Sequence, residues 1–275
     1  MTSDRRRAEA RSQYVHAVGE EAAERLAIAG EIYLPATTGL LRRAALAPGM
    51  RVADIGCGTG NVTRWIADIV GPSGFVLGVD CSAAQLLVAQ AQPTASTPPR
   101  YRQADVRDLS ALPHDFDLVL ARCLLLHLED PAAAVRQMAS LLRPGGVLCS
   151  LEPHVPTWSS HPAHGAFTRH VDLYRELLRL RGGQPDLAPT VPGLFREAAL
   201  TQITINVAQP LLVSARHRAH PALTTRECGP SYLAAGLIDE PSLAELVRGL
   251  ESFADDDADT TLCAGLAFQA TGTKA

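Results

Sequence analysis

The sequence lacks the features that mark membrane, secreted and nucleic-acid-binding proteins. No apolar run approaches the roughly 20 residues that cross a bilayer, so we expect no membrane segment. The opening MTSDRRRAEARSQ has no apolar stretch of the secretory type, and we therefore expect a cytoplasmic protein. The net charge is −4 and the one dense basic run is Arg5–Arg7, which argues against a nucleic-acid substrate.

Cysteine pairing and metal binding also find little support. The cysteines are scattered without a C-x-x-C pair, so we expect reduced thiols. Several histidines fall between residues 154 and 170, but they are spread over a proline-containing loop and not along one helix face. No carboxylate motif accompanies them, and we predict no metal site.

Short apolar segments alternate with helical segments through the first half of the chain. The expected strands cover residues 51–55, 75–79, 101–104, 116–121 and 147–151. Parallel strands need a crossover helix between them, so the pattern predicts an α/β fold. With later strands at 202–207 and 262–271, we expect a Rossmann-like, seven-stranded, mostly parallel sheet with helices on both faces and a helical cap.

A glycine loop, Gly56-Cys57-Gly58-Thr59-Gly60, follows the first expected strand. Glycines let the backbone approach a ligand closely, and the helix behind them offers free N–H groups. Either a dinucleotide or S-adenosylmethionine (SAM) could use such a loop. The NAD fingerprint has two residues between its second and third glycines, and here there is one.

Two carboxylates favour a nucleoside that carries an amino-acid tail. Asp54 precedes the loop, where it would oppose a pyrophosphate but suit an ammonium group. Asp80 ends the second expected strand, where a carboxylate can bind a ribose diol. Together with the loop spacing, these acids favour SAM over NAD.

Five motifs together resemble the class I SAM-dependent methyltransferases. They are VADIGCGTG at 52–60, GVD at 78–80, QADVRDL at 103–109, FDLVLARCLLLHLEDP at 116–131 and LLRPGGVL at 141–148. Their order and spacing are similar to the quinone-type and small-molecule, natural-product branch of the superfamily. The resemblance covers about residues 45–152 and is much looser elsewhere.

The resemblance implies a set of residues around the methionine part of SAM. Asp54, Gly56, Gly58 and Gly60 would surround that part, and Arg122 would line the same side. For Arg122, an exposed or structural arginine is an equal alternative. The product would be S-adenosylhomocysteine.

The nucleoside part has its own implied residues. Asp80 would bind the ribose hydroxyls, while Asp105 and Val106 would hold the adenine. The two acids could instead cap helices or stand as solvated loop acids. Cys57 and Cys81 adjoin the cofactor site, where we expect them to pack and not to react.

Candidate catalytic residues for methyl transfer lie just after the fourth and fifth expected strands. His127, Glu152 and His154 are the catalytic candidates, since a base is needed where the acceptor must lose a proton. His127 could instead be hydrogen-bonded within its own loop. Positioning of the acceptor alone is the other alternative.

We expect a small-molecule methyl acceptor, apolar or aromatic, of the kind found in secondary metabolism. Tyr14, Tyr33 and Trp158 are the candidate substrate contacts, although packing or a homodimer contact would also explain an N-terminal helix. A SAM-binding protein without transfer activity remains open, as does a protein or tRNA methyltransferase. The latter is disfavoured by the acidic net charge and by Ala121–Leu124, which replaces the Asn-Pro-Pro-Tyr motif of amide-methylating enzymes.

The chain is expected to form a single methyltransferase domain over residues 1–275. Its parts would be an N-terminal helical lid at 1–46, with helices at 8–29 and about 34–46, and a SAM-binding core at 47–152. Substrate-cap insertions would follow at 153–254 around the sixth strand, and 255–275 would carry the last strand.

Overall fold

Seven strands form one sheet in the order β3-β2-β1-β4-β5-β9-β7 in this computed structural model, which describes residues 20–93, 97–255 and 260–275. The strands are β1 (Arg51–Ile55), β2 (Phe75–Asp80), β3 (Arg100–Gln103), β4 (Phe116–Arg122), β5 (Leu142–His154), β7 (Leu200–Ala208) and β9 (Leu266–Lys274). Only β9 runs antiparallel to its neighbours. The predicted seven-stranded, mostly parallel α/β sheet is confirmed, and the polar strand β3 lies at its edge.

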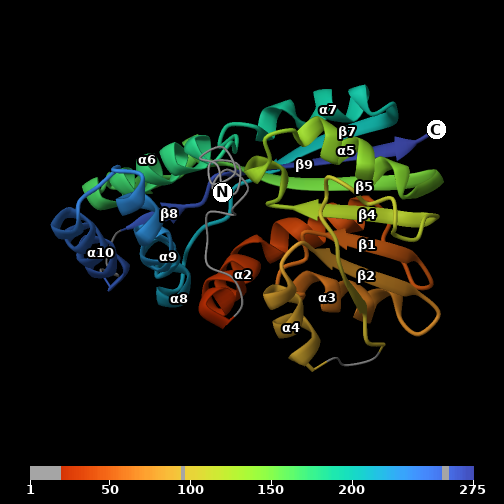
Figure 1. Cartoon of the computed structure of the whole chain (residues 1–275), viewed down its shortest axis with the longest axis horizontal. Coiled ribbons are helices and arrows are strands. Elements are labelled where there is room, and N and C mark those ends of the chain that lie inside the picture. The colour runs from red at the N-terminus through yellow and green to blue at the C-terminus, as the bar shows by residue number, and fades with distance from the viewer. Residues whose placement is uncertain (1–19, 94–96, 256–259) are drawn as a thin grey trace, which may run out of the picture.

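Helices cover both faces of the sheet, as Figure 1 shows. They are α3 (Asn61–Val70) and α4 (Ala83–Ala91) on one face, and α5 (Pro131–Ser140) and α7 (Val191–Glu197) on the other. Side chains of alternate β4 residues therefore pack in two separate hydrophobic clusters, one on each face of the sheet. Leu118 and Leu120 pack in the cluster that holds Ile66 of α3, while Val119 packs with Met138 of α5. Burial on both faces is why this strand reads as a continuous apolar run.

The N-terminal region differs from the prediction of two separate helices. A single helix, α2, runs from Glu20 to Arg43 with Pro35 inside it, so the expected interruption near residues 29–34 is wrong. Its buried residues Ile28, Ile32, Ala36 and Leu40 keep one apolar stripe across the proline. Tertiary packing of this stripe outweighs the local helix-breaking tendency of proline.

The segment that follows residue 151 also departs from the proline-containing loop expected there. Pairing with β9 carries β5 onward to His154, which lies opposite Leu266. A short strand β6 (Ser159–His161) then pairs with β8 (Thr261–Cys263) in a second sheet. The expected last strand at 262–271 is thus divided between β8 and β9. Long-range pairing of this kind leaves no periodic signal in either segment alone.

Four helices form a cap beyond the carboxyl ends of the parallel strands. They are α6 (Gly165–Leu180), α8 (Ala215–Arg218), α9 (His220–Ala234) and α10 (Glu240–Asp255). Figure 1 shows α2 between this cap and the sheet. One buried cluster joins Leu120 of the sheet, Leu40 of α2 and Tyr232 of the cap. The predicted limits of lid, core and cap stay predictions.

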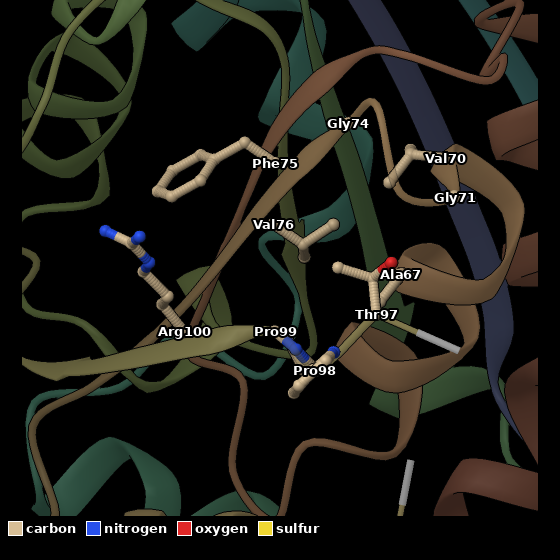
Figure 2. Close-up of a pocket in the computed structure, with 10 residues that line it drawn as sticks. All are labelled: Ala67, Val70, Gly71, Gly74, Phe75, Val76, Thr97, Pro98, Pro99 and Arg100. Carbon is tan, nitrogen blue, oxygen red and sulfur yellow. The ribbon is translucent and has the colours of Figure 1, made fainter. Parts of the chain in front are cut away.

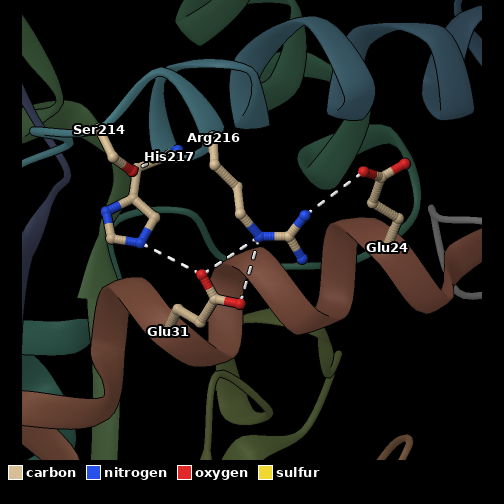
Figure 3. Close-up of polar contacts among 5 residues, drawn as sticks. All are labelled: Glu24, Glu31, Ser214, Arg216 and His217. Carbon is tan, nitrogen blue, oxygen red and sulfur yellow. Dashed lines mark hydrogen bonds and ion pairs between the residues drawn. The ribbon is translucent and has the colours of Figure 1, made fainter.

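Exposed ion pairs tie α8 to α2, as drawn in Figure 3. The Arg216 Nε lies 3.3 Å from Glu31, and another guanidinium nitrogen lies 3.6 Å from Glu24. The His217 Nε2 lies 3.4 Å from Glu31. Each exposed pair stabilises by about 0–1 kcal/mol, so these pairs add little to the attachment of the cap. Among the described residues, no helix is long and apolar enough to cross a membrane.

Candidate active site

The glycine loop joins β1 to α3 in a conformation that ordinary residues rarely adopt. Gly56, Gly58 and Gly60 have φ angles of +75°, +53° and +73°. A Cβ on Gly60 would lie 2.4 Å from the Tyr101 hydroxyl oxygen, and one on Gly56 would lie 3.1 Å from a methyl carbon of Leu124. Both the backbone conformation and the crowding therefore require glycine.

Gly60→Ala is expected to destabilise the protein more than Gly236→Ala. Gly236 has a similar φ of +68° and nothing within 4 Å of its Cβ position, and it ends α9 with the hydrogen bonds typical of an αL glycine, so it isolates the conformational part. We expect a loss of about 1 kcal/mol for Gly236→Ala and about 2–4 kcal/mol for Gly60→Ala, measured by denaturant unfolding. Equal losses would show that the Tyr101 ring moves aside without strain.

Asp54 places a buried carboxylate at the end of β1. It is 3% exposed, and the Thr63 hydroxyl donates to one carboxylate oxygen at 2.6 Å. Burial raises the pKa of Asp54 to about 6, against the lowering effects of Thr63 and the Arg122 charge. Since the buried anion lacks a close cationic partner among the described side chains, a ligand ammonium group would suit it.

Asp80 supports the same loop from the end of β2. Its two carboxylate oxygens accept from the backbone N–H groups of Gly58 and Ser82, each at 2.9 Å. Each oxygen keeps a further lone pair for a ligand hydroxyl. Asp80 thus holds the loop in place and remains available for the predicted ribose contact.

Asp105 makes a local ion pair in this structure. Its carboxylate accepts from the backbone N–H and from the Nε of Arg107, both at 2.9 Å, and from another guanidinium nitrogen at 2.5 Å. The Arg107 hydrogen bond is the main reason why the pKa of Asp105 lies below its ordinary value. Val106 beside it is 8% exposed. The adenine assignment of both residues stays a prediction.

Arg122, at the carboxyl end of β4, and Tyr33 of α2 both have buried polar atoms. Tyr33, on α2, is 4% exposed, and burial raises the pKa of its hydroxyl, with smaller effects from Cys123, Arg122 and Glu152. The Tyr33 hydroxyl and the Arg122 Nη1 are buried and have no hydrogen-bond partner among the described residues. Two unused donors of this kind suit a carboxylate.

Glu152, on β5, is fully buried. Its carboxylate accepts from the backbone N–H groups of Leu124, Leu125 and Leu126 at 3.1, 3.0 and 3.3 Å. These bonds fix the 3₁₀ helix η1 (Leu125–His127) that follows β4. Burial raises the pKa of Glu152 to about 7, although the three N–H groups and Arg122 oppose the shift. The carboxylate is therefore engaged in holding the backbone.

The two candidate histidines end neighbouring segments, His127 the 3₁₀ helix η1 and His154 the strand β5. Desolvation, together with the nearby Arg25 charge, lowers the pKa of His127 to about 3. Desolvation also lowers the pKa of His154, whose ring makes an edge contact with Phe268 at 6.0 Å between centroids. Both imidazoles are consequently neutral at physiological pH.

The two cysteines of the predicted site are poor nucleophiles. Burial raises the pKa of Cys57 above its ordinary value, and the carboxylates of Asp54 and Asp80 add to the effect. Cys81 is exposed, yet partial desolvation and Asp80 raise the pKa of its thiol as well. Thiols in the protonated state react slowly, so neither thiol is activated as a nucleophile, and the expected packing role stays a prediction.

The three predicted substrate contacts have different placements. Tyr33 reaches the end of β4, whereas Trp158 packs within the cap, stacked on Phe167 at 6.5 Å between centroids. Tyr14 lies outside the described residues. Sequence reasoning missed α2 residues that cover the loop, since a methyl carbon of Leu26 lies 4.0 Å from the Cβ position of Gly58.

The sequence matches a family model described as "Methyltransferase domain" over residues 52–146. This segment runs from β1 into β5 and contains the glycine loop, Asp80 and Arg122. Residues 52–146 therefore form a methyltransferase domain of the class I SAM-dependent type.

Several named methyltransferases are similar to this chain. Trans-aconitate 2-methyltransferase of Deinococcus radiodurans is 37% identical over 121 residues, covering 44% of this chain and 43% of that protein. Ubiquinone/menaquinone biosynthesis C-methyltransferase UbiE of Vibrio cholerae is 31% identical over 173 residues, covering 57% and 66%. The matches thus span less than two thirds of these curated relatives.

Solved structures share the fold at low sequence identity. The YcgJ protein of Bacillus subtilis matches with a TM-score of 0.55 and 17% identity, over 86% of this chain and 97% of that one. Phosphoethanolamine N-methyltransferase 2 of Haemonchus contortus matches with a TM-score of 0.54 and 18% identity, over 89% and 55%. The latter structure is described as a complex with SAM.

The residues of this methyltransferase fit SAM at the carboxyl ends of β1, β2 and β4. The fit rests on the buried Asp54 carboxylate and on the unused donors of Arg122 and Tyr33, which match an ammonium and a carboxylate. The glycine positions that admit no Cβ add a close backbone approach.

Two cavities in the described part of the methyltransferase lie away from the glycine loop. The first, of about 190 Å³, is drawn in Figure 2 and is lined by Phe75, Val76 and Arg100. These residues begin β2 and β3, so this cavity lies at the opposite edge of the sheet. The second, of about 540 Å³, lies between α6 and α10. Neither is the cofactor site.

Proposed function

We propose that this protein transfers a methyl group from SAM to O, N or C of a small, apolar or aromatic metabolite, of quinone or natural-product type, in secondary metabolism. One observation carries the proposal. The buried Asp54 carboxylate precedes the glycine loop, and Arg122 and Tyr33 have buried donors without a partner among the described residues, which supports an amino-acid ligand.

The cofactor would be held by groups of opposite charge and by the loop. When bound, SAM supplies an electrophilic methyl group on a sulfonium. Asp54 would take the ammonium group, while Arg122 and Tyr33 would take the carboxylate. Asp80 would accept from the ribose hydroxyls, and Asp105 with Val106 would bind the adenine.

The acceptor class rests on the cap and not on the relatives. The named relatives range from trans-aconitate and quinone methyltransferases to an arsenite methyltransferase, so they do not agree on a substrate. The cap interior contains the rings of Trp158, Phe167 and Phe253. Rings of this kind favour a flat apolar acceptor over a highly charged one.

Positioning is the main catalytic contribution that the residues support. Glu152 is engaged by three backbone N–H groups, and a histidine with a pKa of about 3, such as His127, is a weak base. His154 is the remaining candidate to take a proton, and its lowered pKa weakens it too. The exclusion of water and alignment of the acceptor can supply the rate enhancement without a strong base.

His127→Ala and His154→Ala are therefore expected to retain turnover within about tenfold of the wild type, because a general base usually contributes about 10²–10⁴-fold. Turnover is measured as S-adenosylhomocysteine release with an acceptor found by screening phenols and quinones. The shape of the pH profile serves as the second readout. A loss beyond 100-fold with a changed profile would establish the altered histidine as a base.

Two measurements test the function itself. Calorimetric titration with S-adenosylhomocysteine should show one site per chain. Transfer of a labelled methyl group from SAM into solvent-extractable products should then be seen with a pool of phenolic and quinone acceptors. Cofactor binding without transfer to any pool would favour a SAM-binding protein that is not a transferase. Label appearing in tRNA or protein instead would assign the macromolecular alternative.

A further inference from the structure

Three polar side chains in the cap are buried without a hydrogen-bond partner among the described residues. Both ring nitrogens of His220, the hydroxyl of Thr224 and the indole Nε1 of Trp158 are unpaired in this way. His220 is 7% exposed and Thr224 is 3% exposed. The Trp158 ring lies 6.0 Å from the His220 ring, and Thr224 follows His220 by one turn of α9.

The hydroxyl of the neighbouring residue, Thr225, is hydrogen-bonded, in contrast to that of Thr224. Thr225 is fully buried, and its hydroxyl donates to the Pro221 carbonyl at 2.8 Å and contacts the His170 Nδ1 at 2.8 Å. Buried polar groups in folded proteins are nearly always paired, so a cluster that is not paired calls for an external partner. The two adjacent threonines therefore serve different purposes.

The cluster lies on the seam between α2, the cap and the carboxyl ends of the strands. Arg25 of α2 is paired with Glu227 of α9 at 2.6 Å. The charge of Arg25 contributes to the lowered pKa both of His127, just after β4, and of His220. One side chain thus adjoins the end of the sheet and the cluster, and α2 itself covers the glycine loop.

We propose that His220, Thr224 and Trp158 bind the hydroxyl group of a neutral phenol-type acceptor at this seam. The inference rests on the proposed methyl transfer and names the acceptor class. An indole can only donate, whereas the threonine hydroxyl and a neutral imidazole can also accept. One phenol hydroxyl that accepts from the indole N–H and the threonine O–H and donates to one imidazole nitrogen therefore pairs with all three side chains. The stacked rings of Trp158 and Phe167 offer flat apolar contact beside them.

A neutral ligand fits this place better than a charged one. Arg25, whose charge contributes to the lowered pKa of His220, already forms a buried pair with Glu227. Desolvation lowers the pKa of His220 to about 3, so its ring is neutral at physiological pH. A carboxylate or ammonium brought here would lose its hydration without gaining a counterion.

Thr224→Val and Thr225→Val form a matched pair that tests whether the cluster is unpaired in the free protein. Removing an unpaired buried hydroxyl should raise Tm by about 1–4 °C, whereas removing the paired one should lower Tm by a similar amount or more. His220→Phe should also raise Tm or leave it unchanged. A fall in Tm for Thr224→Val comparable to that of Thr225→Val would mean that the hydroxyl has a structural partner, such as a fixed water, and would overturn the inference.

The ligand class is tested with p-cresol and p-xylene, which differ by one hydroxyl group. Indole ¹⁵N–¹H spectra are simple because the chain has two tryptophans, Trp65 and Trp158. We expect p-cresol to move the Trp158 Nε1–H signal saturably and p-xylene to move it at least fivefold less at equal concentration. His220→Phe should weaken the p-cresol effect by about tenfold. Equal shifts with both compounds, or no shift with p-cresol, would refute the site.

S-adenosylhomocysteine binding separates this inference from the proposed function. His220→Phe should bind S-adenosylhomocysteine within about twofold of the wild-type Kd, since His220 is not among the cofactor residues. If the wild-type protein fails to bind S-adenosylhomocysteine, the proposed function is wrong whatever p-cresol does. If it binds while the threonine pair or p-cresol gives the contrary result, only the acceptor site is wrong.

Discussion

Asp80→Ala should weaken the binding of S-adenosylhomocysteine by about 10²–10⁴-fold, because two charge-assisted hydrogen bonds to ribose hydroxyls would be lost at about 1.5–3 kcal/mol each. The carboxylate oxygens already accept from Gly58 and Ser82 and are thereby held at the end of β2. A group fixed in advance loses little freedom when the ligand arrives. Calorimetry gives the Kd directly.

Two further variants separate a ligand contact from a change in the loop. Asp80→Asn keeps the size of the side chain and one acceptor oxygen, so we expect an intermediate loss of affinity. Asp108→Ala removes an exposed acid that accepts only locally from Ser110, and its Kd should equal that of the wild type. An unchanged Kd for Asp80→Ala would show that the ribose assignment is wrong.

Local signals explain why much of the core could be predicted from the sequence. Asp130 caps α5 by accepting from the Ala133 N–H at 2.8 Å, and Ser82 caps α4 from Gln85 at 3.3 Å. Such pairs are a few residues apart and recur wherever a helix begins. The glycine loop is equally local, since its spacing and positive φ angles belong to one turn.

The contacts that sequence reasoning missed are long-range. Glu152 reads as a free acid at a strand end, but its partners lie 26 to 28 residues earlier in the chain. His220 lies 62 positions after Trp158, and nothing local marks the pair as buried together. Tertiary packing also decides that α2 continues through Pro35. None of these follows from propensity or periodicity, which describe a single element.

Glu152→Gln should change how the stability of this protein depends on pH. The ordinary pKa of a glutamate is 4.5, whereas burial raises the pKa of Glu152 to about 7 in the folded protein. Between these values the folded state holds a proton that the unfolded state has lost, so the free energy of unfolding falls as pH rises. At about 1.4 kcal/mol per pH unit, the wild type should lose about 3 kcal/mol from this group between pH 5 and pH 8.

The difference between the two proteins isolates this contribution. Asp54, with a pKa raised to about 6, acts in the same direction but is present in both proteins and cancels. An amide resembles a protonated carboxyl, so Glu152→Gln should approach wild-type stability at pH 5 and exceed it near pH 8. Glu197→Gln, at an exposed position, is the control. Parallel stability curves for the wild type and Glu152→Gln would contradict the buried titration.

The ionised Glu152 carboxylate lowers stability near neutral pH, but it also fixes the backbone of Leu124–Leu126. Only the ionised form offers lone pairs to all three N–H groups of Leu124–Leu126 without presenting a donor of its own. Leu124 packs against the Cβ position of Gly56 at 3.1 Å, so these bonds also set the shape of the glycine loop. Glu152→Gln should therefore bind S-adenosylhomocysteine about tenfold more weakly at pH 8 despite its greater stability, because a misplaced amide donor costs about 1–3 kcal/mol. Stability gained together with affinity lost is the result that distinguishes a positioning residue from a merely structural one.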